Sequence, residues 1–177
     1  MNDKAPAVTV RGFMPSDEDR VNALARAAFA QYKGQYDDWP SFIDGIGRMA
    51  QMTAGGDLFV AEHGGAIAGA VVHVGPGRPR SPIFPDAWSV IRMLVVAPER
   101  RGLGIGRQLV AACLECALRD NAPAVGLHTS PVMASALRLY TTIGFTRDSD
   151  LPPIRGVPYG RYVLPADGID EAIALLR

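Results

Sequence analysis

The segment VAPERRGLGIGRQLV, residues 96–110, decides the fold of this 177-residue chain. It follows the apolar run WSVIRMLVV, residues 88–96, which predicts a long, buried strand. Beyond the segment, apolar residues recur at helical spacing and predict an amphipathic helix. These residues are Leu109, Val110, Cys113, Leu114, Ala117 and Leu118. The segment is therefore expected to connect a buried strand to a helix.

The connection is rich in glycine and arginine. Backbone N–H groups at a helix start point outward together and, with the helix dipole, attract a phosphate or pyrophosphate. Glycines let the backbone approach such an anion closely, and arginines supply positive charge beside it. The glycines are Gly102, Gly104 and Gly106, and the arginines are Arg100, Arg101 and Arg107. An ordinary glycine-rich turn with surface arginines fits these residues about as well.

Two well-known phosphate-binding loops do not match. A P-loop needs lysine and then serine or threonine after its last glycine, but Gly106 is followed by Arg107 and Gln108. A dinucleotide fingerprint that starts at Gly102 needs its third glycine where Arg107 stands. A nucleotide-binding α/β domain of another kind remains an alternative at this point.

The rest of the chain predicts one α+β (mixed α/β) domain over residues 1–177, without a linker or an internal repeat. Besides 88–96, strands are expected at 8–10, 58–62, 66–74, 124–128, 145–147 and 159–164. Besides the helix after Gly106, helices are expected from Ser16 as N-cap to Phe29, at 42–50, from Ser130 as N-cap and Pro131 as first residue to Gly144, and at the C-terminus (169–177). Proline-containing loops are expected at 75–85 and 149–158.

Composition excludes several function classes. The chain carries 18 basic and 18 acidic residues, so overall charge does not favour binding to nucleic acid. No apolar run is long enough to span a bilayer, and no secretory signal is visible, so a cytoplasmic protein is expected. Cys113 and Cys116 are interpreted as free thiols inside a helix. With three scattered histidines, no metal site is predicted.

Three segments resemble the GNAT N-acetyltransferase superfamily. Residues 96–110 resemble its acyl-CoA-binding motif, Arg/Gln-x-x-Gly-x-Gly/Ala, through Arg101, Gly104 and Gly106. ALRLYTTIGF (136–145) resembles its tyrosine helix, and FVAEHGGAIAGAVV (59–72) resembles its second and third strands. The resemblance covers nearly the whole chain. It implies a central mixed, mostly antiparallel sheet of about seven strands, splayed between strands 4 and 5 and flanked by about four helices.

The resemblance also implies a cofactor and a reaction. Acetyl-CoA would lie in the splayed gap, and a primary amine would attack its thioester directly in a ternary complex. Backbone groups of the fourth strand would pair with the pantetheine arm, and the glycine loop would cradle the pyrophosphate. The implied cofactor-binding residues are Leu94, Val95, Val96, Arg101, Gly102, Leu103, Gly104, Ile105, Gly106, Arg107, Met133 and Ala136.

Tyr140 matches the tyrosine that protonates the departing CoA thiolate in this superfamily. A phenol with a reference pKa of about 10 is protonated at neutral pH and can donate to a thiolate. The alternative is a tyrosine that packs its ring on the core, because Met133, Ala136 and Leu137 share its helix face.

Two positions depart from the family pattern. Arg92 stands where many members carry the glutamate of the general base, and Met133 stands where many carry an asparagine. The remaining base candidates are His128, Glu62, Asp86 and a chain of water molecules. These departures motivate an alternative function, a catalytically degenerate acyl-CoA-binding or sensing module of the same fold.

The acceptor is expected to bind between residues 31–39 and 149–158. The first segment mixes aromatic rings with carboxylates, which would suit a cationic amine, although a solvated acidic loop fits equally well. Its residues of this kind are Tyr32, Tyr36, Asp37, Asp38 and Trp39. A small-molecule amine and a protein or peptide amine both remain open as partners, and so does a homodimer.

Overall fold

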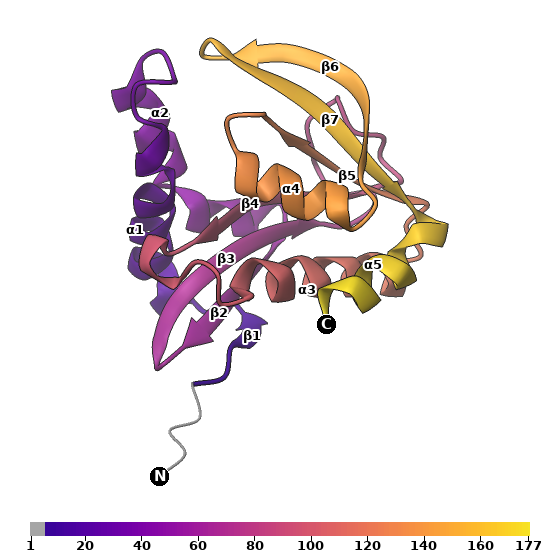
Figure 1. Ribbon diagram of the computed structural model, residues 1–177, viewed down its shortest axis with the longest axis horizontal. Helices are drawn as coiled ribbons and strands as arrows, with labels where there is room; N and C mark the ends of the chain where they lie inside the picture. Colours follow the sequence, from indigo (N-terminus) through magenta and orange to yellow (C-terminus); the bar gives the residue numbers. More distant parts are fainter. Residues whose placement is uncertain (1–5) are drawn as a thin grey trace.

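The computed structural model describes residues 6–177, and in them one seven-stranded sheet carries the fold (Figure 1). The strand order is β1-β2-β3-β4-β5-β7-β6. The strands are β1 (Thr9–Gly12), β2 (Asp57–His63), β3 (Ala66–Val74), β4 (Ser89–Val96), β5 (Ala124–Thr129), β6 (Thr146–Ile154) and β7 (Val157–Pro165). The helices are α1 (Glu18–Phe29), α2 (Trp39–Ile46), α3 (Ile105–Arg119), α4 (Ala134–Thr142) and α5 (Ile169–Leu176). The predicted mixed, mostly antiparallel sheet is confirmed.

The sheet opens between β4 and β5. All other neighbouring strands pair antiparallel, whereas β4 and β5 run parallel and share only the register pairs Ser89 with Val125 and Val90 with Gly126. Beyond Val90 the two strands diverge, as Figure 1 shows beside α4. The predicted splay between the fourth and fifth strands is therefore confirmed.

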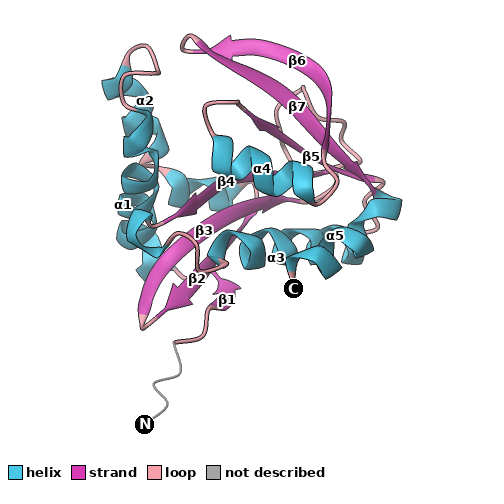
Figure 2. Cartoon of the chain, in the orientation of Figure 1, coloured by secondary structure: helices cyan, strands magenta, loops and turns pink. Residues whose placement is uncertain are grey.

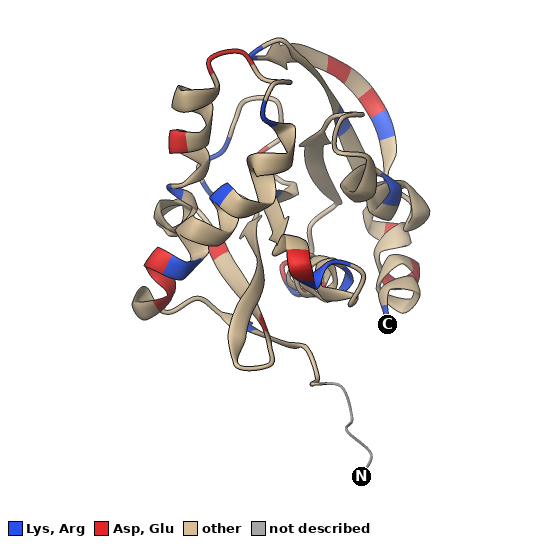
Figure 3. Cartoon of the chain, turned by 60° about the vertical axis from the view of Figure 1, so that its left-hand side comes forward, with Lys and Arg blue, Asp and Glu red and all other residues tan. Residues whose placement is uncertain are grey.

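Two apolar cores cover the two faces of the sheet. On one face α3 and α5 pack on the sheet, with Leu109, Leu114 and Ile169 fully buried (Figure 2). On the other face α1 packs through residues such as Val21 and Ala25. Each helix turns one apolar stripe to the sheet, as its 3.6-residue period requires. Charges of both signs are scattered over the face shown in Figure 3.

Two helices begin later than the sequence suggests. Ser16 lies in a 3-10 turn (Pro15–Asp17) and does not cap the helix. The side-chain acceptor at this turn is the buried carboxylate of Asp17, which accepts the Met14 N–H at 2.8 Å. Ser130 begins a turn in which its own backbone carbonyl accepts the Met133 N–H at 2.9 Å. The helix α4 therefore begins only at Ala134. Both serine N-caps are wrong because the neighbouring proline starts a tight turn before the helix rather than the helix itself.

The segment predicted as a second proline loop, 149–158, is instead the half of a long β-hairpin that contains its turn. β6 runs through Pro152 and Pro153 to Ile154, and the turn at Arg155 and Gly156 leads into β7. Proline lacks a backbone N–H, but β6 is an edge strand with one unpaired side, where proline is tolerated. The register also shifts between Leu151 and Ile154, at the two prolines.

Gly69 lets α3 approach β3 closely. A Cβ added there would lie 2.6 Å from Ile105 Cγ2 and 2.9 Å from Leu109 Cδ1. We expect Gly69→Val to lower the free energy of unfolding by about 2 kcal/mol, because the overpacked site must push α3 away from the sheet. Urea denaturation measures this change, and Gly12→Val is the control because nothing lies within 4 Å of an added Cβ there. Equal stability of the two variants would contradict the close approach.

Candidate acyl-CoA site

A cavity of about 350 Å³ lies where β4, the glycine loop, α4 and the end of α1 meet. Of the predicted cofactor-binding residues, it is lined by Leu94, Val95, Val96, Arg101, Gly102, Ile105, Gly106, Met133 and Ala136. Residues from α1 and the segment after it, which the motifs did not indicate, also line the cavity: Ala28, Phe29, Gln31 and Tyr32. The fold thus gathers three distant segments around one space.

Three predicted residues stand outside this wall. Leu103 is exposed to solvent, and Gly104 is the N-cap residue of α3. The guanidinium of Arg107 donates to the carbonyl of Leu175 in α5 instead of turning to the cavity. Arg107 can therefore contribute its backbone N–H to a ligand at the helix start, while its side chain ties α3 to α5.

One wall of the cavity is an unpaired strand edge. Because β4 pairs with β5 only up to Val90, the backbone of Leu94, Val95 and Val96 has no strand partner on that side within residues 6–177. A free edge of this kind pairs with an extended chain that carries amide groups. The pantetheine arm of coenzyme A, which contains two amides, has this chemistry.

The glycine loop forms the other end of the cavity. Gly102 and Gly104 have φ of 80° and 78°, which a side chain would strain. Gly104 caps α3, so the N–H groups of Ile105, Gly106 and Arg107 precede the first intrahelical bond, which Gln108 donates to Gly104. Three free N–H groups and the positive end of the helix dipole therefore face one point, which suits a pyrophosphate.

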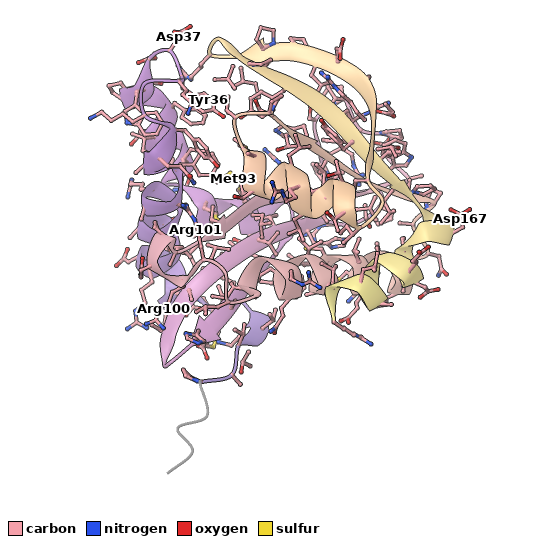
Figure 4. The ribbon with its side chains drawn as sticks, viewed as in Figure 1. Tyr36, Asp37, Met93, Arg100, Arg101 and Asp167 are labelled. Atoms are coloured by element: carbon pink, nitrogen blue, oxygen red, sulfur yellow. The ribbon has the colours of Figure 1, made fainter. Side chains whose placement is uncertain are left out.

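Two arginines border this end of the cavity. Arg101 donates to the Ala28 carbonyl at 3.3 Å and to Gln31 at 3.4 Å, so it spans from the loop to α1. Arg100 lies 2.6 Å from Nδ1 of His63, which the sequence did not associate with the loop. Figure 4 shows Arg101 on the side of α4 that faces α1. Within residues 6–177 neither guanidinium pairs with a carboxylate, so both charges are available to an anion.

A bulge in β4 changes the direction of its side chains. Arg92 pairs with Val72 and Val95 pairs with Ala70, so two residues of β4 lie opposite one residue of β3. Met93, in the bulge, has a φ of 55°. Val90, Met93 and Val95 pack on the α1 face, so Arg92 and Met93 lie consecutively on that face. Arg92 thus lies on the α1 face by ordinary alternation from Val90, and the bulge adds Met93 to the same face.

Tyr140 is buried in the core and does not line the cavity. Its ring packs edge-on against Phe145 with centroids 5.7 Å apart, and only 5% of the residue is exposed. Burial raises the pKa of its phenol, with a further contribution from Cys113. The hydroxyl is therefore protonated at neutral pH, and the packing role considered for the ring is present in the structure. Its catalytic role stays a prediction.

His128 lies on β5, on the side of the gap that faces away from α3. Its ring is 6.1 Å from that of Phe84 and 5.5 Å from that of Tyr159 between centroids, and its buried Nδ1 has no hydrogen-bond partner within residues 6–177. Burial, assisted by the charge of Arg92, lowers the pKa of His128 to about 4. The imidazole is therefore neutral near pH 7 and a weak base.

The stability of the protein is expected to depend on pH through His128. The native pKa of about 4 lies below the reference value of 6.5, so the unfolded chain binds the proton more tightly. The contribution of the neutral, buried His128 to the free energy of unfolding is complete above pH 6.5 and is lost as the pH falls towards 4. Denaturation at pH 7 and pH 4.5 should show that wild type loses on the order of 2 kcal/mol more than His128→Gln. Equal losses would contradict the burial of a neutral imidazole.

The other base candidates lie elsewhere. Glu62 pairs with Arg11 at 2.6 Å on the β1 side of the sheet. Asp86 lies exposed in the proline loop between β3 and β4. Of the side chains considered as bases, the structure brings only His128 to the gap.

The predicted acceptor segments do come together, and their carboxylates contact the hairpin. Asp38 pairs with Arg155 at 2.8 Å, and the Asp37 N–H donates to the Arg155 carbonyl at 2.8 Å. A Cβ on Gly156 would meet the Asp37 carboxylate at 2.6 Å. These acidic groups therefore hold the tip of the β6-β7 hairpin against the start of α2, and Asp38 is not free to bind a cationic amine.

Aromatic side chains form the interior of this region. Tyr36 stacks on Phe42 with centroids 3.9 Å apart, and its hydroxyl hydrogen-bonds that of Tyr159 in β7. Trp39 packs 5.8 Å from Phe42. Figure 4 shows Tyr36 on the α1 and α2 side of the gap. The acceptor side is thus largely aromatic and neutral.

A splayed sheet with a free β4 edge and a glycine-rich helix start defines the class of acyl-CoA-binding acetyltransferase folds. The family model for the acetyltransferase (GNAT) domain matches residues 54–147, which is more than half of the chain. The chain belongs to the GNAT acetyltransferase family. Within residues 6–177 no helix is long and apolar enough to cross a membrane.

Curated relatives share this domain within longer proteins. A mycothiol acetyltransferase of Arthrobacter sp. (strain FB24) is 31% identical over 151 residues, which is 81% of this chain and 44% of that protein. Its counterpart in Thermomonospora curvata is 35% identical over 148 residues, which is 79% of this chain and 44% of that protein. The chain thus spans less than half the length of these relatives.

Solved structures share the fold. YncA of Salmonella typhimurium, solved with its cofactor acetyl-CoA, superposes with a TM-score of 0.69 at 20% identity over 91% of this chain and 95% of that one. An N-acetyltransferase of Staphylococcus aureus Mu50 has a TM-score of 0.69 at 18% identity over 90% and 99% of the two chains. At these identities the likeness shows the fold alone.

Proposed function

We propose that this chain is an N-acetyltransferase that transfers an acetyl group from acetyl-CoA to a primary amine. The observation that carries the proposal is the free edge of β4, which leads directly to the three N–H groups at the start of α3. An amide-bearing arm and a pyrophosphate, joined in one ligand, fit these two features together. The names of the curated relatives support acetyl as the group transferred.

The residues present fit acetyl-CoA, and each has a defined part. The β4 edge at Leu94, Val95 and Val96 binds and orients the pantetheine arm. Gly102, Ile105 and Gly106 let the backbone reach the pyrophosphate. Acetyl-CoA, when bound, supplies the thioester that a neutral amine attacks directly in a ternary complex. A backbone N–H of β4 polarises the thioester carbonyl, in the manner of an oxyanion hole.

Tyr140 is proposed as the general acid. Its raised pKa keeps the phenol protonated, so the hydroxyl can donate its proton to the departing thiolate. On the amine side, the low pKa of His128 favours proton release through water over direct transfer to the imidazole. His128 then serves as a neutral wall of the acceptor space.

A second candidate function is an acyl-CoA-binding or sensing module without transfer activity. The burial of Tyr140 away from the cavity and the presence of Arg92 at the usual glutamate position favour it. Binding of acetyl-CoA is expected in both cases, whereas release of free CoA in the presence of an amine distinguishes them.

The experiment measures ligand binding and turnover on the same protein. CoA and acetyl-CoA should raise the melting temperature, while NAD and ATP should not, because only a ligand that binds the native state stabilises it. Acetyl-CoA with a panel of amines should then release free thiol in an amine-dependent way. Binding without turnover on any amine would support the sensing module, and a shift with NAD or ATP alone would overturn both candidates.

The acceptor class, a homodimer and a cytoplasmic location stay predictions. The relatives are named for mycothiol, but this chain matches less than half of each of them. A protein or peptide amine and a small-molecule amine are both compatible with the proposed reaction.

A further inference from the structure

Arg92 is a charged group that the fold leaves without a partner. Within residues 6–177 it makes no salt bridge and no side-chain hydrogen bond. Surrounding protein atoms nevertheless lower the pKa of its guanidinium. Arg92 is still an exposed residue of β4, so an anionic ligand can reach its guanidinium from solvent.

The surroundings of Arg92 form a small site. The guanidinium lines a second cavity, of about 180 Å³, whose other walls come from Met52, Gly55, Val72, Val74 and Pro79. Arg92 is the one charged residue in this wall. The cavity can therefore hold a small anionic group against a single planar donor, which suits a carboxylate.

The site lies beside the proposed reaction centre. Arg92 precedes Leu94 by two residues on β4, which is at most about 7 Å along a strand. It lies on the α1 face, next to Met93 of the bulge, and its charge lowers the pKa of His128 across the gap. A group held by Arg92 thus lies on the α1 face of β4, two residues along the strand from Leu94 of the proposed pantetheine edge.

Of the two carboxylates in residues 31–39, only that of the exposed Asp37 makes no ion pair within residues 6–177. Asp38 is paired with Arg155, Asp37 packs on Gly156, and His128 carries no charge at neutral pH. Tyr36, Tyr159 and Phe84 present aromatic surfaces.

We propose that the acceptor is a primary amine that also carries a carboxylate, as an amino acid with an apolar side chain does, and that Arg92 binds this carboxylate. This inference rests on the proposed acetyl transfer and names the substrate class of that site. Arg92 acts as a specificity-determining residue that orients the amine towards the thioester.

The test compares matched pairs of acceptors that differ only in the carboxylate. Suitable pairs are phenylalanine with phenethylamine, leucine with 3-methylbutylamine, and methionine with 3-(methylthio)propylamine. The ratio of kcat/KM within each pair is measured for wild type, for Arg92→Gln and for the control Arg20→Gln, an exposed arginine at the start of α1. Because each pair is the same for all three proteins, differences in amine basicity cancel.

We expect Arg92→Gln to lower the acid-to-amine ratio by about 30-fold, which is the range for a hydrogen-bonded ion pair. Arg20→Gln should keep the wild-type ratio. An unchanged ratio in Arg92→Gln, or better turnover of the amines than of the amino acids by wild type, would overturn the inference while acetyl transfer itself stands.

A binding measurement decides the inference even without turnover. If no acceptor is acetylated, the proposed transfer fails, and calorimetry on the CoA-loaded protein replaces kinetics. N-acetylphenylalanine should then bind wild type at least about 10-fold more tightly than N-acetylphenethylamine does, and Arg92→Gln should lose this preference. Equal affinities in wild type would overturn the carboxylate site.

Discussion

Replacing Gly106 with aspartate is expected to weaken acetyl-CoA binding by about 1,000-fold, because two like charges about 4 Å apart repel by roughly 4 kcal/mol at an effective dielectric constant of 20. Gly106 lines the cavity at the start of α3, next to the proposed pyrophosphate position. An added Cβ would meet only ordinary contacts, the nearest at 3.8 Å, so the fold should persist. Isothermal titration of acetyl-CoA into the folded variant measures the change.

The control carries the same new charge at a distant glycine. Gly12, at the end of β1, has nothing within 4 Å of an added Cβ. Gly12→Asp should therefore bind acetyl-CoA as wild type does. Similar affinities for Gly106→Asp and Gly12→Asp would place the pyrophosphate elsewhere and remove the glycine loop from the binding site.

Removing the hydroxyl of Tyr140 is expected to lower kcat by about 100-fold with little change in KM, which is the lower range for the loss of a general acid. The ring of Tyr140→Phe keeps its contact with Phe145, so packing is retained. Because burial raises the pKa of the Tyr140 phenol, the wild type should not lose activity through deprotonation of this group as the pH rises from 7 to 9. Steady-state kinetics with a saturating amine measures both quantities.

Tyr162 provides a matched control for this substitution. It is a buried tyrosine on β7 in the same core cluster, 7% exposed, and it does not line the cavity. Tyr162→Phe should keep kcat within about twofold of the wild type. If Tyr140→Phe also stays within this range, the tyrosine is a packing residue and another group protonates the thiolate.

Local patterns were enough to predict most of the fold. The β2-β3 hairpin, the buried β4 and the amphipathic α3 each follow from a hydrophobic period and a turn that short stretches of sequence contain. The extent of β6 could not be predicted in this way, because Pro152 and Pro153 ordinarily end a strand. Only the strand order shows that β6 lies at the edge, where these prolines are tolerated.

The cofactor side of the site was more predictable than the acceptor side. The motif around Gly104 and Gly106 is local, and the structure places it at the helix start as expected. The contacts of Arg101 with α1, of Arg100 with His63 and of Tyr36 with Tyr159 join residues far apart in the chain. No period or spacing encodes such contacts.

The sequence also did not predict the contact of the Arg107 side chain or the surroundings of Arg92. Arg107 belongs to the motif, yet its guanidinium contacts Leu175, which the sequence could not bring near. In the sequence Arg92 only replaces an expected glutamate, whereas the structure places it on the α1 face beside an otherwise uncharged cavity. Its unpaired charge is visible only in three dimensions.

The most direct measurement is a crystal structure of the protein with coenzyme A. We expect hydrogen bonds between the pantetheine amides and the backbone of Leu94, Val95 and Val96. The pyrophosphate should lie on the N–H groups of Ile105, Gly106 and Arg107, at the end of the cavity of about 350 Å³. Coenzyme A bound at another surface, with the β4 edge left unpaired, would contradict the central claim.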